Sequence, residues 1–429
     1  MHKCIFYRMR WFLIVVLMAG PAYADTSTAT LDTLVGEVLE KNPELKFYES
    51  EIAAAKGSRQ TAGLWANPEV SGSFGQKKVW NDEGELIGKG DSNDVAITQT
   101  FEWPGRIGLR RAIADRDIEL AELGLEGFKS SLTIRAKVAT YKWAAAQVNE
   151  SATLEVAEHF RAMREVLSQR SPAGLSPLLE MRIIEAMDIN MQRKASEVSL
   201  AATAALLELN HLRGAAPDDK PSLRNLELDF SPFEKDRVEL LKIARAKDFT
   251  VRERAIELKR QGFEVGLAEN ERLPAITVGP SFSQEKAGER ERVIGAAVSL
   301  PFPVWNLNQG SIATAKARRT QAEASFYIAV RGAERRAIEI AVTYETKLKE
   351  MGRWQQDSIK HFKEAAELAD RHYRLGAVPV SIYVELQTQY LEALAGLHNT
   401  KIEALEAATQ LEVLTGSPSS LVHQAAVEK

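Results

Sequence analysis

The stretch LWANPEVSGSFG, from Leu64 to Gly75, changes from a helical pattern to the alternating pattern of a β-strand. The stretch RLPAITVGPSFS, from Arg272 to Ser283, makes the same change later in the chain. The prolines of the two stretches, Pro68 and Pro274, lie 206 positions apart. Because proline does not continue a helix, each of them marks a point where a helix gives way to a strand.

Further landmarks recur at nearly the same offset. RSPAGLSP and YRLGAVP place Gly174 over Gly376 and Pro177 over Pro379, and both LELNHLRG and QLEVLTG end in glycine. The period is too long for a solenoid, whose units span about 20 to 50 residues. The chain therefore reads as a duplicated half-protein.

We expect a first repeat over residues 25–213, a linker over 214–235, a second repeat over 236–416 and a tail over 417–429. The linker contains three prolines and shows no helical period. It is the natural boundary between the repeats.

Residues 1–24 have the three parts of a secretory signal peptide. Lys3, Arg8 and Arg10 precede an apolar run from Trp11 to Ala19, and a small-residue site ends at Ala24. A retained membrane anchor is the alternative, but such a helix needs about 20 apolar residues. We expect cleavage after Ala24 and export of the mature chain.

Composition excludes several classes of protein. The formal net charge of −4 and the lack of a long basic block argue against a nucleic-acid partner. The single cysteine, Cys4, lies in the signal, so disulfides and zinc thiolates are not expected. No catalytic or cofactor motif occurs, and the scattered histidines suggest surface positions. We predict no enzyme, no cofactor and no metal site.

Four segments carry the strand pattern, with apolar residues on one face and small or polar residues on the other. Val95, Ile97 and Phe101 alternate with Ala96 and Thr98, for example. The links between paired strands are polar and charged, as in exposed hairpin loops. The predicted strands are residues 69–77, 93–103, 275–284 and 293–302.

Aromatic residues flank these segments. Trp65, Trp80, Trp103 and Trp305 match the aromatic girdles of a membrane barrel. An aromatic core under a soluble sheet is the alternative. Four strands cannot close a barrel, since membrane barrels have about eight or more, so a membrane location requires several chains.

A long helix is predicted from Gly105 to Arg170, and a second proline-free, alanine-rich stretch runs from Gln309 to Arg374. Apolar and small residues recur every seventh position along the first, which indicates coiled-coil packing. Two such lines, through Ile113 and Ile118, predict a neighbouring helix on each flank. A ring of helices around a tunnel and a layered soluble bundle both fit this pattern.

The combination resembles the TolC-like outer-membrane efflux factors. The resemblance rests on the signal peptide, the duplicated halves, the NPEL of Asn42 to Leu45, the proline-entered strands, YRLGAVPVSIYVELQTQYLEA and the terminal LEVLTG. It implies a mainly α fold with a small β part. Three chains would share a periplasmic α-helical barrel and a transmembrane β-barrel, with four strands from each chain.

The resemblance also implies a function. The chain would be a homotrimeric passive duct in the outer membrane, with its helices in the periplasm. A periplasmic adaptor and an inner-membrane pump would be its partners, and outer-membrane lipid would surround its strands. The alternatives from other classes are a periplasmic adaptor and a soluble coiled-coil scaffold.

In such factors, helix-to-helix turns at the periplasmic tip form a gate. The matching turn formers here are Gly174, Pro177, Gly376 and Pro379, and the gate candidates are Glu180, Tyr373 and Glu385. Val378 and Ile382 replace charged residues of the family pattern, so the closed-state ion pairs should differ. FEWPGRIGLRRAIA, from Phe101 to Ala114, is similar to the branch that serves heavy-metal cation pumps.

Overall fold

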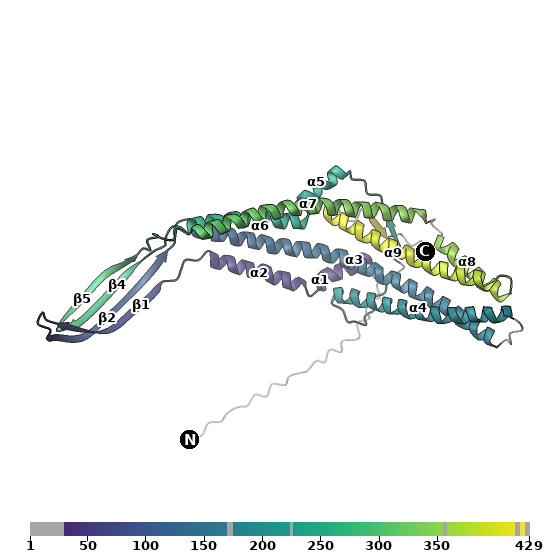
Figure 1. Ribbon diagram of the computed structural model, residues 1–429, viewed down its shortest axis with the longest axis horizontal. Helices are drawn as coiled ribbons and strands as arrows, with labels where there is room; N and C mark the ends of the chain where they lie inside the picture. The colour runs from purple at the N-terminus through teal and green to yellow at the C-terminus, as the bar shows by residue number, and fades with distance from the viewer. Residues whose placement is uncertain (1–29, 170–174, 224–225, 355–357, 417–420, 425–429) are drawn as a thin grey trace, which may run out of the picture.

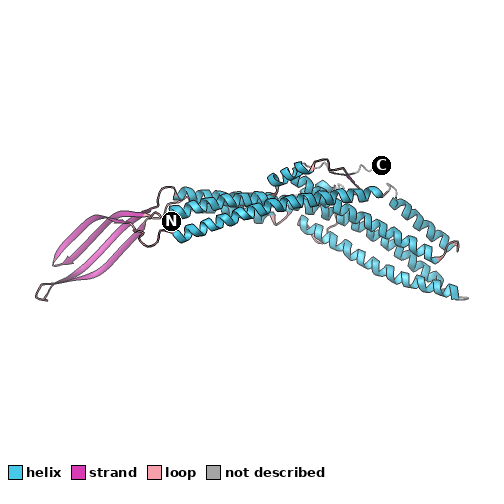
Figure 2. Ribbon diagram, turned by 45° about the horizontal axis from the view of Figure 1, so that its top comes forward, coloured by secondary structure: helices cyan, strands magenta, loops and turns pink. Residues whose placement is uncertain are grey.

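The computed structural model describes residues 30–169, 175–223, 226–354, 358–416 and 421–424. The molecule is long and narrow, with a β-sheet at one end and paired helices reaching to the other (Figures 1 and 2). The expected signal peptide, with Cys4, and the expected turn at Gly174 lie outside the described residues.

The two halves repeat one order of elements, in which two helices precede two strands and long helices follow. The first half contains α1 (Leu31–Lys41), α2 (Leu45–Ala62), β1 (Glu69–Trp80), β2 (Leu86–Phe101), α3 (Arg106–Ser168) and α4 (Leu175–Arg213). The second contains α5 (Arg237–Lys247), α6 (Phe249–Asn270), β4 (Ile276–Ala287), β5 (Glu289–Ser299), α7 (Gln309–Arg353), α8 (Ser358–Arg374) and α9 (Val380–Thr415). Two short strands complete the described chain, β3 (Leu228–Phe230) and β6 (Val422–Gln424).

The helical segment at the start of each half is divided into two helices, where the sequence pattern indicated one. In the NPEL motif, Asn42 has extended backbone and its side chain accepts a hydrogen bond from the Glu44 N–H at 2.9 Å. In the second half, Asp248 caps α6 by accepting from the Thr250 N–H at 2.9 Å. Asp248 caps the start of α6, whereas Asn42 forms a side-chain turn just before α2. Each break is therefore specified by nearby residues.

The four long strands form one antiparallel sheet in the order β1-β2-β4-β5. At the hairpin ends the strands extend beyond their predicted limits, and most of the residues expected in polar loops are paired backbone. At the helix ends, β2, β4 and β5 are shorter than predicted by two, one and three residues. The hairpin between β4 and β5 turns at Gly288, whose φ of 109° is readily adopted only by glycine. Polar composition was misleading there, because exposed hairpin ends carry charged side chains while their backbones stay paired.

The long helix α3 has 63 residues and ends close to the predicted limits. It packs against α1, α2 and α4 on one side and against α6 and α9 on the other. Leu132, Ala139 and Tyr141 from the two predicted sevenfold lines are buried. The expectation of a neighbour on each flank is therefore confirmed.

The stretch from Gln309 to Arg374 is two helices, whereas its lack of proline suggested one. Helix α7 ends at Arg353, and Trp354 after it has an extended ψ of 120°. The Trp354 N–H bonds to the Met351 carbonyl at 3.0 Å, which closes the last turn. Proline is only one way to end a helix, so its absence did not predict continuity.

Near the middle of the molecule, β3 from the linker pairs with β6 after α9. Tyr344 of α7 is fully buried beneath them and donates to the Ser231 carbonyl at 2.6 Å. Glu412 of α9 forms an ion pair with Lys137 of α3 at 3.3 Å and accepts from the Leu421 N–H at 3.2 Å. This small sheet, which the sequence pattern did not reveal, joins the linker and the C-terminal segment to both repeats.

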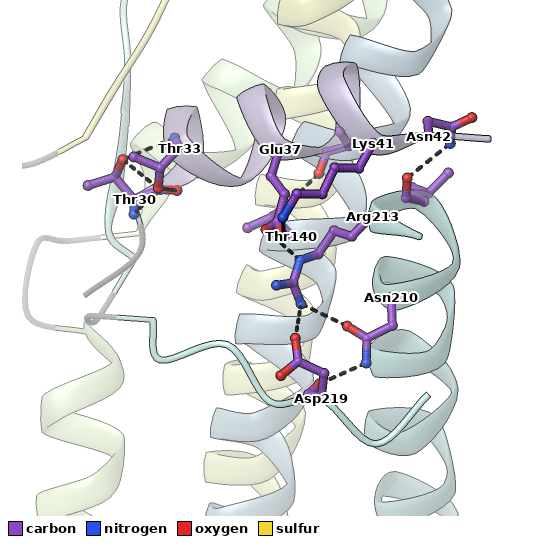
Figure 3. A network of polar contacts seen from close by, with 11 residues as sticks. Thr30, Thr33, Glu37, Lys41, Asn42, Thr140, Asn210, Arg213 and Asp219 are labelled. Atoms are coloured by element: carbon purple, nitrogen blue, oxygen red, sulfur yellow. Dashed lines mark hydrogen bonds and ion pairs between the residues drawn. The ribbon is translucent and has the colours of Figure 1, made fainter. Parts of the chain in front are cut away.

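A polar network holds the first helix to the end of the first repeat (Figure 3). Arg213 donates to Glu37 at 2.9 Å and to Asp219 at 2.8 Å. Asn42 donates to the Leu212 carbonyl at 2.9 Å. Burial disfavours the Glu37 charge, but Arg213 and Lys41 outweigh that effect and lower its pKa. One network of ion pairs and hydrogen bonds thus connects the linker, α1 and α4.

Candidate functional site

The register of the sheet gathers apolar side chains on one face. Val95 lies opposite Phe282, and Phe282 lies opposite Ile294, so three strands contribute to the same row. These side chains face no described element, and Phe74 and Ile294 are 80% and 84% exposed. We call this surface the apolar face. Its apolar members are Val70, Phe74, Val95, Ile97, Phe101, Ile276, Val278, Pro280, Phe282, Ile294, Ala296 and Val298.

The other surface of the same sheet is polar, and we call it the polar face. Serine, threonine, glycine and alanine dominate it, as in the row from Ser71 through Ala96 and Ser281 to Gly295. Within the described strands it carries one base, Lys77, which pairs with Glu285. Its acidic members are Glu69, Asp94, Glu285, Glu289 and Glu291. The predicted alternation is confirmed, and the polar face has an excess of negative charge.

The four singled-out tryptophans lie at the two ends of the sheet. Trp80 ends β1 at the hairpin end, while Trp65, Trp103 and Trp305 lie in the connections to the helices. Trp305 is 92% exposed, and the Trp65 ring contacts Phe101 with centroids 5.8 Å apart. These rings are not covered by an aromatic core.

The sheet is open at both edges, because β1 and β5 each pair with one strand only. The outer backbone groups of β1 and β5 have no strand partner within the described chain. In water such groups bond to solvent, but in lipid each unpaired group costs several kcal/mol. A sheet with one exposed apolar face and two open edges is incomplete as a membrane structure.

The far end of the molecule is a helical tip where α8 turns into α9. The Ala377 N–H bonds to the His372 carbonyl at 2.8 Å, and the Gly376 N–H bonds to Tyr373 at 2.9 Å. This is a Schellman motif, which needs a left-handed residue, and Gly376 supplies it with φ 73°. Pro379 is the N-cap of α9. Pro177, the counterpart of Pro379 in the first repeat, lies in the first turn of α4, where proline is tolerated.

The three gate candidates lie on three helices. Tyr373 is on α8 and stacks on Tyr383 of α9, with ring planes 5° apart and centroids 5.1 Å apart. Glu385 is exposed on α9 and accepts a hydrogen bond from Gln389 at 2.9 Å. Glu180 is half-buried on α4.

Residues that the sequence reasoning did not single out build the packing behind the tip. Tyr383 is fully buried and also contacts Phe160 of α3, with centroids 5.0 Å apart. Burial and the nearby Asp370 raise the pKa of the Tyr383 hydroxyl. Asp370 is paired with Arg374 at 2.9 Å. In the sequence, the four-residue spacing of Asp370 and Arg374 on a helix is the feature that indicates this ion pair.

No helix within the described ranges is both long and apolar enough to cross a membrane. Across the same residues, no group of three or more histidine, cysteine, aspartate or glutamate side chains is arranged to hold a metal ion.

Comparison with solved structures identifies the class of the fold. The Campylobacter jejuni CmeC outer membrane channel matches with a TM-score of 0.72 and 16% identity, over 91% of this chain and 86% of that one. The open-state MtrE outer membrane channel of Neisseria gonorrhoeae gives 0.68 and 16%, over 90% and 88%. CusC gives 0.64 and 13%, over 91% of each chain. The fold is that of the outer-membrane channels.

The sequence of the second repeat agrees with this assignment. Residues 240–417 match the model of the family described as Outer membrane efflux protein. Comparison with curated proteins gives no match. The family match covers the second repeat, and the solved structures show the fold over about nine tenths of the chain.

Proposed function

We propose that the chain is the outer-membrane component of a tripartite efflux system. Three copies would form a passive duct that receives substrates from an inner-membrane pump through a periplasmic adaptor. The observation that carries this proposal is the sheet, whose apolar face is exposed while its polar face is lined by small and charged residues. Transport through a duct needs no chemical step, so the proposal assigns no catalytic residue.

The open edges of the sheet support the trimer. Joining β5 of one copy to β1 of the next would pair the edge backbone groups that lipid cannot satisfy. Three sheets of four strands reach twelve, which lies within the known range for closed membrane barrels of about 8 to 26 strands. A periplasmic adaptor or a soluble scaffold would leave the apolar face and both edges exposed to water.

We further propose cations, with heavy-metal cations among them, as the cargo. The apolar face would point to lipid, so the polar face and its acidic excess would line the lumen. Repeated around a narrow pore, carboxylates favour cations and repel anions. The resemblance of the Phe101–Ala114 stretch to the metal-cation branch points to the same cargo.

Fractionation and deletion test this function. The mature protein should remain with outer membranes until detergent is added, and chemical cross-linking in detergent should yield a trimer. Deletion should make cells hypersensitive to toxic metal cations, since the pump would lose its exit. Recovery as a water-soluble periplasmic monomer would refute the duct, and unchanged cation tolerance with dye sensitivity would refute the metal cargo.

The tip is our proposed gate, with Glu180, Tyr373 and Glu385 facing the narrowest part of the tunnel. Glu385→Gln should reduce block of the reconstituted pore by multivalent cations, because it removes one carboxylate from every copy. Glu406→Gln is a matched control, because Glu406 also lies on α9 and accepts from an amide four residues later, at 3.2 Å. Equal block in both variants and the wild type would exclude Glu385 from the gate.

A further inference from the structure

The apolar face carries a group of basic residues close to the hairpin ends of the strands. We call this group the basic belt. Its members are Lys78, Lys89, Lys286, Arg290 and Arg292. All five are exposed, and Asp91 is the one acidic residue on this face of the described strands. The charge excess is therefore opposite in sign to that of the polar face.

The belt places like charges directly opposite each other. Lys78 lies opposite Lys89 in the β1–β2 pairing, and Lys286 lies opposite Arg290 in the β4–β5 pairing. Side chains in such pairs are about 5 Å apart at Cβ, and like charges there are destabilising. An arrangement of this kind is stabilised when an external anion lies over the pair.

The belt lacks internal counter-charges. Within the described chain, no ion pair includes any of its five residues, and Arg292 donates to the neutral amide of Gln284 at 3.2 Å. On the polar face, in contrast, Lys77 has both Glu285 and Glu291 within ion-pair distance. The cations of the apolar face are thus available to an outside partner.

On β4 and β5, the belt begins where the apolar residues end. On β5, Arg292 follows Ile294 on the same face, and on β4, Lys286 lies four residues beyond Phe282. At about 3.3 Å per residue, the basic groups begin roughly 7 to 13 Å beyond the last apolar row. The apolar band of a membrane barrel ends at the membrane interface. Basic groups just beyond it lie level with the lipid headgroups.

We infer that the basic belt binds the phosphate groups of lipid headgroups in the outer leaflet. This inference rests on the proposed function, which places the apolar face in lipid and the hairpins outside. Arginine can hold a phosphate with two parallel hydrogen bonds, and lysine supplies a compact positive charge. Bound phosphates would neutralise the opposed pairs and fix the depth of the barrel in the membrane.

The test uses the full mature chain in detergent, with lipid A bearing both phosphates and the same lipid after dephosphorylation as probes. Native mass spectrometry should show wild-type protein binding the phosphorylated lipid on the order of tenfold more tightly, because each contact is charge-assisted. The double variant Lys286→Gln/Arg290→Gln should lose most of this preference. The charge-retaining variant Lys286→Arg/Arg290→Lys should keep it.

Lys77→Gln is the control for the opposite face and should leave lipid binding unchanged. An equal preference in the wild type and the double glutamine variant would overturn the inference. Complete displacement by an equal concentration of inorganic phosphate would also overturn it, since the site would then recognise the free ion. Pore conductance of the same samples separates the two levels, because conducting protein without phosphate preference refutes the belt and leaves the duct intact.

Discussion

At the scale of single residues, His398 is a titratable side chain that is partly buried between helices. It lies on α9, with its Nδ1 2.8 Å from the Asn149 side-chain oxygen of α3. Burial, together with the charge of Lys401, lowers its pKa to about 4. The folded protein therefore favours the neutral ring.

This pKa predicts a pH dependence of stability. Because the folded pKa lies below the unfolded value, the contribution of His398 is complete above about pH 6.5 and is lost as the pH falls towards 4. The loss is on the order of 2 to 3 kcal/mol. Thermal unfolding in detergent at pH 7.5 and 4.5 should show a smaller difference between the two pH values in His398→Gln than in the wild type.

Exposed His361 on α8 provides the control for this measurement. His361→Gln should keep the pH dependence of the wild type. If His398→Gln also kept it, the histidine would not be the titrating group.

Residue roles could be predicted from the sequence only where a turn or a face was involved. Gly376 and Pro379 are turn formers in the structure as the landmark spacing indicated. Tyr383 was not predicted, because its importance comes from Phe160 on α3 and Tyr373 on α8, which are distant in sequence or on another helix. Burial of this kind depends on tertiary packing and leaves no local signal.

At the scale of elements, glycine substitutions distinguish the tip turn from the body of a helix. Gly376→Ala should destabilise the α8–α9 hairpin by about 1 to 2 kcal/mol, because alanine disfavours the left-handed backbone at φ 73°. Gly396→Ala, inside α9, should stabilise the protein by about 1 kcal/mol, since an added Cβ meets nothing within 4 Å. Thermal midpoints of the two variants should move in opposite directions.

A shift of both midpoints in the same direction would contradict the assigned backbone roles.

The element predictions themselves succeeded where a pattern was long and failed where it was short. The sevenfold lines correctly predicted α3, whereas β3 and β6 have three residues each and carry no detectable period. Helix α7 ends at Arg353, where Trp354 has an extended backbone, and no composition rule predicts that end.

At the scale of the whole molecule, the two faces of the sheet should respond differently to one substitution. Val298 and Ser299 are neighbours on β5, yet Val298 lies on the apolar face and Ser299 on the polar face. Val298→Lys should destabilise the membrane-inserted sheet, because lysine on a lipid-facing strand costs about 2 to 4 kcal/mol at the middle of the bilayer and less toward its surfaces. Ser299→Lys should be tolerated, and the yield of folded protein in outer membranes measures both.

Equal yields from the two lysine variants would show that the apolar face does not meet lipid.

The duplicated plan, the mainly helical fold and the four-stranded sheet could all be predicted from the sequence, because they follow from repeated landmarks and a period of two. The opposite charge excess of the two faces was not predicted. It depends on the register that brings Lys286 opposite Arg290 and Glu285 opposite Glu291.

The pairing of β3 with β6 also constrains the time course of folding. β3 lies in the linker, and its partner follows every other described element of the chain. Closing a contact over so long a separation is slow in comparison with local helix formation. Helical hairpins can form early in folding. The β3–β6 pairing near the middle of the molecule forms only after the C-terminal strand is available, so the chain stays incompletely folded until then.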